Sequence, residues 1–152
     1  MCYKKASINA AFSNGLRRCP CCNIQLVWKA NRDNLQKNLA TVDHMIAKSL
    51  GGPNTSDNMF VMCRQCNEDR GNQCFVEFVV SRGVSKIEAE ELYKNAHIAS
   101  VRYLIDMLMN QARNPSERKA FKNKVRAIVT SYRKYFNDYL PEFDLLPREI
   151  CK

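Results

Sequence analysis

The chain has 152 residues, and 45% of them are hydrophobic, which is enough to fill the core of one domain of ordinary size. Its formal net charge is +9, and basic residues are in excess in both halves of the chain. An acidic partner is therefore expected, and nucleic acid is the first candidate because Lys and Arg neutralise its phosphates. No apolar run approaches the ~18 residues of a membrane span, and the start of the sequence lacks the apolar core of a signal peptide. We therefore expect a cytoplasmic protein with no membrane partner.

The predicted elements begin with a short helix over 5–13, which ends at Asn14-Gly15, a pair typical of a left-handed helix cap. The segment 23–28 alternates loosely between polar and apolar residues, which favours a strand. Residues 29–40 are polar and rich in Asn and Lys, so we expect a loop there.

Two short strands and a helix are predicted in the middle of the chain. The β-branched run at 41–44 predicts the first strand, and the apolar run at 59–62 predicts the second. Between them, residues 48–57 are dense in Gly, Pro, Asn and Ser, which is typical of an exposed loop. A helical segment over 64–71 follows, so the order is strand, long loop, strand and helix.

The rest of the chain is predicted to be helical. Residues 74–80 have the β-branched content of a strand, but their position after a helix leads us to predict another helix. A capping box formed by Ser85 and Glu88 begins a long helix, whose apolar face comprises Leu92, Ile98, Val101, Ile105 and Leu108. Asn114, followed by Pro115, begins a second long helix that ends before Pro141, with an apolar face at Phe121, Val125, Ile128, Tyr132 and Tyr135 or Phe136.

The cysteines indicate a metal site. Where thiols stay reduced, paired CxxC spacings indicate metal binding rather than disulfides. Zinc takes four thiolates at about 2.3 Å in a closed, structural site. We therefore predict a structural Zn²⁺ site formed by Cys19, Cys22, Cys63 and Cys66. Cys21 remains open as a substitute for Cys22, whereas Cys2, Cys74 and Cys151 have no partner at ligand spacing.

Four polar residues around the second CxxC pair are not accounted for by zinc; they are Asp43, His44, Asn58 and Asn67. Carboxylate and amide oxygens suit a hard cation such as Mg²⁺, and histidine suits a general base because its pKa of ~6.5 lies near neutral pH. Neighbouring residues of a strand point to opposite sides, so Asp43 and His44 reach one phosphate only if the strand bends. Taken singly, Asn58 and Asn67 also fit plain capping roles, and His97 on the predicted long helix fits a structural role.

The segments VDHMIAKSLGG, DNMFVMCRQCN and RGN, with the first CxxC before them, resemble the HNH nuclease family in its zinc-stapled ββα-metal form. Asn67 stands in place of the last His of that pattern, as in the family's phage junction resolvases. The resemblance covers about residues 16–75. It implies that Asp43 and Asn67 bind one Mg²⁺ or Mn²⁺, with Asp69 as a further candidate ligand. It also implies that His44 activates water, that Asn58 orients the loop that aims His44, and that cleavage leaves a 5′-phosphate and a 3′-hydroxyl.

Together, the motif and the elements predict an α+β fold that is mostly α. We expect an HNH nuclease core with zinc knuckles in residues 1–83. A helical C-terminal extension in residues 84–152 is expected to pack on that core as one compact unit. The phage-like pattern makes the cytoplasm of a bacterium or of an infected host the expected compartment.

Basic residues around the motif and along the last helix are predicted to contact DNA. They are Arg17, Arg18, Lys48, Arg64, Arg70, Arg118, Lys119, Lys122, Lys124 and Arg126. Such contacts bind phosphates and carry no sequence information. The aromatic residues at 132–143 fit either core packing or a homodimer interface formed by the C-terminal helices.

The leading hypothesis is a metal-dependent DNA endonuclease. Two other functions remain open: a non-catalytic, zinc-stabilised module that binds nucleic acid, and a zinc-stabilised adaptor for protein partners. Cleavage that requires a divalent cation distinguishes the first hypothesis from both of these. Salt-sensitive affinity for nucleic acid distinguishes the second from the third.

Overall fold

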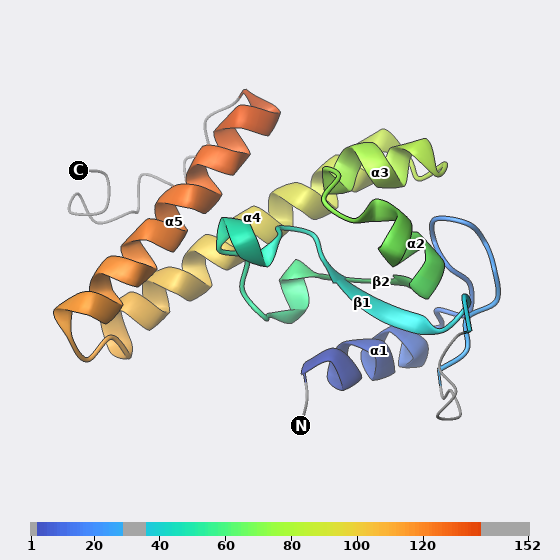
Figure 1. Cartoon of the computed structure of the whole chain (residues 1–152), viewed down its shortest axis with the longest axis horizontal. Helices are drawn as coiled ribbons and strands as arrows, with labels where there is room; N and C mark the ends of the chain where they lie inside the picture. Colours follow the sequence, from blue (N-terminus) through green and yellow to red (C-terminus); the bar gives the residue numbers. More distant parts are fainter. Residues whose placement is uncertain (1–2, 29–35, 138–152) are drawn as a thin grey trace.

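The structure, a computed structural model, describes residues 3–28 and 36–137 (Figure 1). Within these residues, five α-helices and a two-stranded sheet form an α+β fold that is mostly α, as predicted. No helix in this described part of the chain is both long enough and apolar enough to cross a membrane.

The two strands and the helix after them form the ββα unit that the sequence predicts. β1 (Ala40–His44) pairs antiparallel with β2 (Met59–Cys63), with His44 opposite Met59. α2 (Arg64–Arg70) follows β2 directly, and the sulfur of Cys63 caps it by accepting a hydrogen bond from the backbone N–H of Cys66. α2 packs on one side of the sheet and α1 (Tyr3–Ser13) on the other (Figure 1). The sheet is therefore covered on both faces, although it has only two strands.

The connection between the strands is the Gly-Pro-Asn-rich loop that the sequence predicts, with two single turns of 3₁₀ helix in it, η1 (Lys48–Leu50) and η2 (Ser56–Asn58). The loop folds tightly back on the end of β1. At Gly52 an added Cβ atom would lie 2.0 Å from the carbonyl oxygen of Ile46, so only glycine fits there.

The predicted strand over 23–28 is wrong. Only two isolated bridges form in this region, Arg18 with Gln25 and Val27 with Leu39. Asn23 has a φ of 61°, in the left-handed region, so the backbone turns where the strand was expected to begin. The backbone N–H of Asn23 donates to the carbonyl of Cys19, which closes the CxxC turn instead. Most of the loop predicted over 29–40 lies outside the described residues.

The C-terminal part is helical, and the helix predicted over 74–80 is confirmed as α3 (Phe75–Ser81). The two long helices are α4 (Lys86–Asn110) and α5 (Pro115–Phe136). Asn114 caps α5 as predicted, because its side-chain oxygen accepts a hydrogen bond of 2.9 Å from the N–H of Glu117. Ser85 is the N-cap residue of α4, but its side chain forms no capping hydrogen bond.

The buried face of α4 differs in part from the predicted one. Leu92, Ile98 and Ile105 are only partly buried. The residues that face the core are Ala89, Tyr93, Ala96, His97, Ser100, Val101, Leu104 and Leu108. The reason is that α4 packs against both α3 and α5, so the polar-looking side chains of Tyr93 and His97 turn toward the rings of α5.

The aromatic residues at the end of α5 belong to the core of the chain. The rings of Tyr132 and Phe136 lie 4.6 Å apart, and the ring of His97 lies 5.5 Å from that of Tyr132. Buried residues from both halves of the chain belong to one hydrophobic cluster. The homodimer and the division into 1–83 and 84–152 remain predictions, and the aromatic positions at 138–143 lie outside the described residues.

Candidate active site and metal centre

Four cysteine sulfurs meet where the first CxxC turn packs against the β2–α2 junction. The sulfurs of Cys19, Cys22, Cys63 and Cys66 all lie within 4.8 Å of one another. Four thiolates at about 2.3 Å from a tetrahedral zinc ion are spaced by about 3.8 Å, so the cluster fits zinc after small adjustments. Three of the four residues are buried, and Cys22 is exposed. The predicted set of cysteines is thus brought together, with Cys22 rather than Cys21 as its second member.

The protonation of these thiols depends on whether a cation is bound. Burial raises the pKa of Cys63 and Cys66, whereas a hydrogen bond with the Cys21 thiol lowers the pKa of Cys19. Thiolates that are buried together need a positive charge between them, because burial without one favours the neutral thiol. Cys21 is itself buried, and its thiol forms a hydrogen bond with the sulfur of Cys19.

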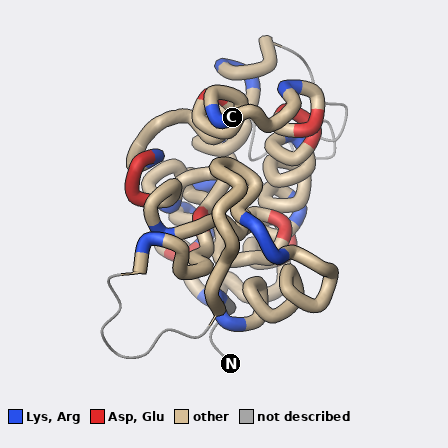
Figure 2. Tube along the Cα trace, turned by 90° about the vertical axis from the view of Figure 1, so that its right-hand side faces the viewer, with Lys and Arg blue, Asp and Glu red and all other residues tan. Residues whose placement is uncertain are grey.

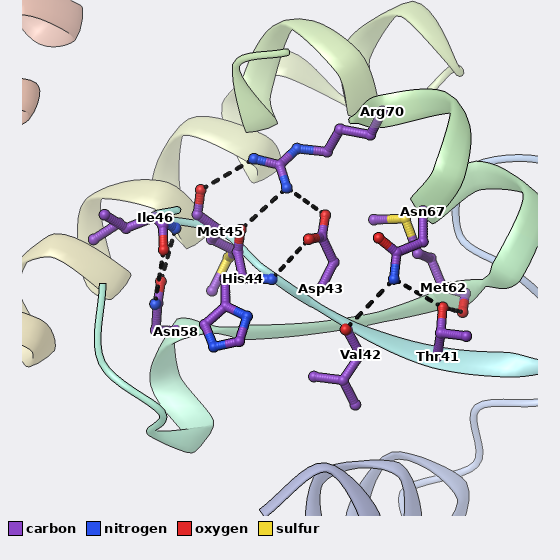
Figure 3. A network of polar contacts seen from close by, with 10 residues as sticks. All are labelled: Thr41, Val42, Asp43, His44, Met45, Ile46, Asn58, Met62, Asn67 and Arg70. Carbon is purple, nitrogen blue, oxygen red and sulfur yellow. Dashed lines mark hydrogen bonds and ion pairs between the residues drawn. The ribbon is translucent and has the colours of Figure 1, made fainter. Parts of the chain in front are cut away.

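The carboxylate of Asp43 is held by Arg70, a pairing that the sequence did not suggest. Its Oδ2 atom forms an ion pair with Arg70, and its Oδ1 atom accepts a hydrogen bond of 2.8 Å from the backbone N–H of His44. Arg70 also donates to the carbonyl of His44, at 3.1 Å, and to that of Met45 (Figure 3). Arg70 therefore fixes the end of β1 from the last turn of α2.

Arg70 was predicted to contact DNA, and the structure differs on this point. The residue is only 6% exposed, and its guanidinium lies against the ring of Phe75. A buried arginine that already neutralises a carboxylate is not available to a phosphate at the surface. This ion pair could not be predicted from the sequence, because Asp43 lies on a different element from Arg70.

Asn67 lies across from Asp43 on α2. Its amide nitrogen donates to the hydroxyl of Thr41, at 3.1 Å, and to the carbonyl of Val42, at 3.4 Å. These bonds leave its amide oxygen on the side that faces Asp43 (Figure 3). Two oxygen donors of the kind that Mg²⁺ prefers therefore face each other, although Asp43 also binds Arg70. The donor set fits a hard divalent cation.

His44 is the last residue of β1, and its imidazole extends away from the Asp43 carboxylate (Figure 3). The bend that would aim both side chains to one side is not present, so the alternation of the strand holds here. The Nε2 atom lies 2.9 Å from the side-chain oxygen of Asn54. Burial lowers the pKa of His44 below its ordinary value, and the nearby Lys48 ammonium acts in the same direction. The imidazole is therefore neutral at neutral pH.

Asn54 is the second residue that sequence reasoning missed. It lies in the exposed part of the loop, directly after Pro53, and nothing in its local pattern distinguishes it from an ordinary turn residue. With the amide oriented as it stands, its oxygen accepts the Nε2 proton, which makes Nδ1 the basic nitrogen of His44.

Asn58 fixes the loop that carries Asn54. It is fully buried, and its side chain accepts from the N–H of Ile46 at 2.8 Å and donates to the carbonyls of Ile46 and Pro53, both at 3.1 Å. The two ends of the loop are thereby tied to each other. The role of Asn58 in orienting His44 stays a prediction.

Residues 19–73 match the family model described as HNH endonuclease. This segment is an HNH endonuclease domain. The match begins at the first cysteine of the cluster and includes both CxxC turns, the loop and α2. Neither curated proteins nor solved structures gave a significant match to the chain. An HNH domain implies a nucleic-acid substrate and nuclease chemistry in general.

Two other titratable residues of the chain stay outside the HNH site. Asp69, the further candidate ligand, accepts hydrogen bonds from Gln65 at 2.7 Å and from Arg82 at 2.9 Å. It lies two residues after Asn67 and so about 200° around α2, which turns it away from Asp43. His97 is buried in the aromatic core between α4 and α5, as expected of a structural histidine.

The basic residues predicted to contact DNA are spread over the molecule. Seen from the side shown in Figure 2, Lys and Arg lie on several separate elements, with acidic positions between them. Near the zinc turn, Arg17 and Arg18 each donate to backbone carbonyls, and Arg64 pairs with Glu68. Lys48 lies in the loop between β1 and β2, residues 45–58, which is called the HNH loop below. The remaining members, Arg118, Lys119, Lys122, Lys124 and Arg126, lie along α5.

Among these five, Lys124 lies against the loop between β1 and β2. Lys122 and Arg126 are each two positions from Lys124, so they lie about 200° around the helix from it. α5 therefore does not present all five residues on one surface that could contact DNA. As DNA contacts, the exposed residues remain predictions.

Proposed function

We propose that this protein is a metal-dependent DNA endonuclease that hydrolyses phosphodiester bonds, with His44 as the general base. The observation that carries the proposal is the hydrogen bond of 2.9 Å between His44 Nε2 and Asn54, at the end of the strand that also carries Asp43. A histidine held through one ring nitrogen and kept neutral by burial is suited to take a proton through the other.

In the proposed reaction, a water molecule beside the scissile phosphate gives its proton to Nδ1 of His44 as its oxygen attacks phosphorus. Asn54 keeps the ring in one orientation, and its oxygen accepts the Nε2 proton both before and after the transfer. Asn58 holds the loop so that Asn54 stays in reach. The P–O bond to the 3′ oxygen breaks and that oxygen takes a proton from solvent, which leaves a 5′-phosphate and a 3′-hydroxyl, as the resemblance to the HNH family implies.

Asp43 and Asn67 are the proposed ligands of one Mg²⁺ or Mn²⁺ at the phosphate. When bound, this cation would neutralise the charge that develops on the phosphate and on the leaving oxygen. Arg70 holds the Asp43 carboxylate in place by an ion pair from the buried side of α2. The phosphate is proposed to lie at the end of β1, and for both the ligand oxygens and His44 to reach it the His44 side chain must turn toward the Asp43 side when DNA binds.

The cysteine cluster has a separate, structural role in this proposal. Four cysteine ligands fill all positions of a tetrahedral zinc ion, so none remains for a substrate. The zinc would join the first CxxC turn to the helix that carries Asn67 and Arg70. Zinc thereby supports the geometry of the site and takes no part in hydrolysis.

The test is cleavage of supercoiled plasmid by the purified protein with Mg²⁺ or Mn²⁺. We expect His44→Ala to lower the rate by about 10²- to 10⁴-fold, the usual contribution of a general base, with zinc content and thermal melting unchanged. Cleavage by His44→Ala at the wild-type rate refutes the role of His44. Binding of DNA without cleavage under either cation identifies the protein instead as a non-catalytic, zinc-stabilised binding module.

A further inference from the structure

A groove of about 410 Å³ lies between the HNH loop and the two long helices. Its wall combines residues of the loop with residues of α4 and α5, which lie outside the segment that matches the HNH family. The side chains that matter here are Lys48, Asn54, Tyr103, Met107, Phe121 and Lys124. In the loop, the turn η1 contacts α5 and the turn η2 contacts α4, and Figure 1 shows the loop beside these two helices.

The loop is fixed against α5 by a close backbone approach. Gly51 has a φ of 91°, and an added Cβ would lie 3.2 Å from the Cα of Lys124. A side chain at this position would therefore push the loop away from the helix. The groove is thus a fixed feature of the fold, with one wall set by the loop that orients His44.

The lining of the groove combines aromatic rings with positive charge. Tyr103 is 41% exposed, which is high for a large aromatic side chain on a packed helix. The ammonium of Lys124 lies 5.8 Å from the centre of the Phe121 ring. Lys48 contributes a second positive charge from the loop. Rings that can stack on a base, next to cations that can bind a phosphate, are the combination found in sites for single-stranded nucleic acid.

We propose that this groove binds one unpaired nucleotide of the DNA substrate, next to the scissile phosphate. The base stacks on Tyr103 beside Phe121, and its phosphate is bound by Lys48 and Lys124. A volume of about 410 Å³ lies at the lower end of the range for small-ligand sites, which suits a single nucleotide. The proposal rests on the proposed function, because it takes His44 to act on the phosphate beside the groove.

Asn54 lies between the groove and His44, the proposed general base. It lines the groove and also accepts the hydrogen bond from Nε2 of His44. A nucleotide in the groove is therefore separated from the general base by one side chain. Another hollow, of about 370 Å³ beside Asn67, has no aromatic residue in its lining, and its Arg64 is paired with Glu68.

The substrate class follows from the shape of the groove. A base within continuous duplex DNA is stacked and paired, and it enters a pocket only after it is extruded at a cost in free energy. A base in a gap, branch or single strand is already available. The preferred substrate is therefore DNA with an unpaired segment next to the cleaved bond.

The experiment measures binding and cleavage separately on two labelled DNAs of related sequence, a continuous duplex and a duplex with a short single-stranded gap. Four full-length proteins are compared: wild type, Tyr103→Ala, Tyr103→Phe and, as a control, Met109→Ala. Met109 is 60% exposed on the same helix and does not line the groove. Binding is followed by fluorescence anisotropy without added Mg²⁺, and cleavage is followed after Mg²⁺ is added.

We expect wild type to bind the gapped DNA about tenfold more tightly than the duplex, as one stacked base allows. Tyr103→Ala should lose this preference, whereas Tyr103→Phe and Met109→Ala should keep it. Equal affinity of wild type for both DNAs, or an unchanged preference in Tyr103→Ala, overturns the groove proposal. If wild type cuts neither DNA but the Tyr103-dependent preference is present, the proposed function fails and the nucleotide site stands.

Discussion

Acid should destabilise the protein through His97, because this residue is buried in the neutral form. Its side chain is fully buried, its Nδ1 donates a hydrogen bond of 2.8 Å to the carbonyl of Tyr93, and the rings of Tyr93 and Tyr132 lie against it. Within the described residues, its Nε2 atom has no hydrogen-bond partner. Protonation would place an uncompensated charge between α4 and α5, the two helices that form one wall of the groove.

The magnitude follows from the shift in pKa. Burial lowers the pKa of His97 to about 4, from an ordinary value of 6.5. Because the pKa of the folded state is the lower one, the unfolded chain binds the proton first as the pH falls. This contribution to stability is complete above about pH 6.5 and is lost progressively down to about pH 4. Between pH 7 and pH 5 the loss amounts to about 2 kcal/mol of the free energy of unfolding.

The assay is urea unfolding of wild type and His97→Gln at pH 7 and at pH 5. The variant lacks the titrating group, so its stability should fall by about 2 kcal/mol less than that of wild type over this interval. Loss of cysteine ligands in acid affects both proteins alike and cancels in the difference. An equal fall in both proteins refutes the reasoning.

Two further predictions concern the metal centre and the general base. Cys63→Ser should abolish the binding of zinc, measured by elemental analysis, and lower the free energy of unfolding by several kcal/mol. Cys74→Ser, outside the cluster, should retain zinc. Equimolar zinc in Cys63→Ser argues against the site. Asn54→Ala should lower kcat about tenfold or more, because the ring of His44 loses its orientation, and Asn54→Asp, which keeps an oxygen acceptor, should retain most of the activity. An unaltered kcat in Asn54→Ala contradicts its positioning role.

The sequence by itself determined the features that depend on the spacing of residues along the chain. The two CxxC pairs predicted the cysteine cluster, because a CxxC turn presents two sulfurs to one ion with little strain. The run from Asp43 to Asn67 identified the HNH domain, and the ββα order followed from local periodicity. The caps and lengths of α4 and α5 were also readable, because helix signals act within a few residues.

Only the tertiary structure decided which side chains meet. Arg70 looked like a surface cation until α2 packed on β1 and brought it to Asp43, a residue 27 positions earlier. Asn54 looked like a turn residue until the loop folded back on the end of β1 and placed it against His44. The buried face of α4 was misjudged in part because Tyr93 and His97 owe their burial to the rings of α5.

The physical reason is the same in each case. Spacing along the chain determines which atoms of one turn or one helix can act together, and those distances are fixed by backbone geometry. Partners from separate elements are selected by packing, which depends on the whole core at once. The groove beside His44 belongs to this second kind, since its walls come from a loop at 48–54 and from helices that begin at Lys86 and Pro115.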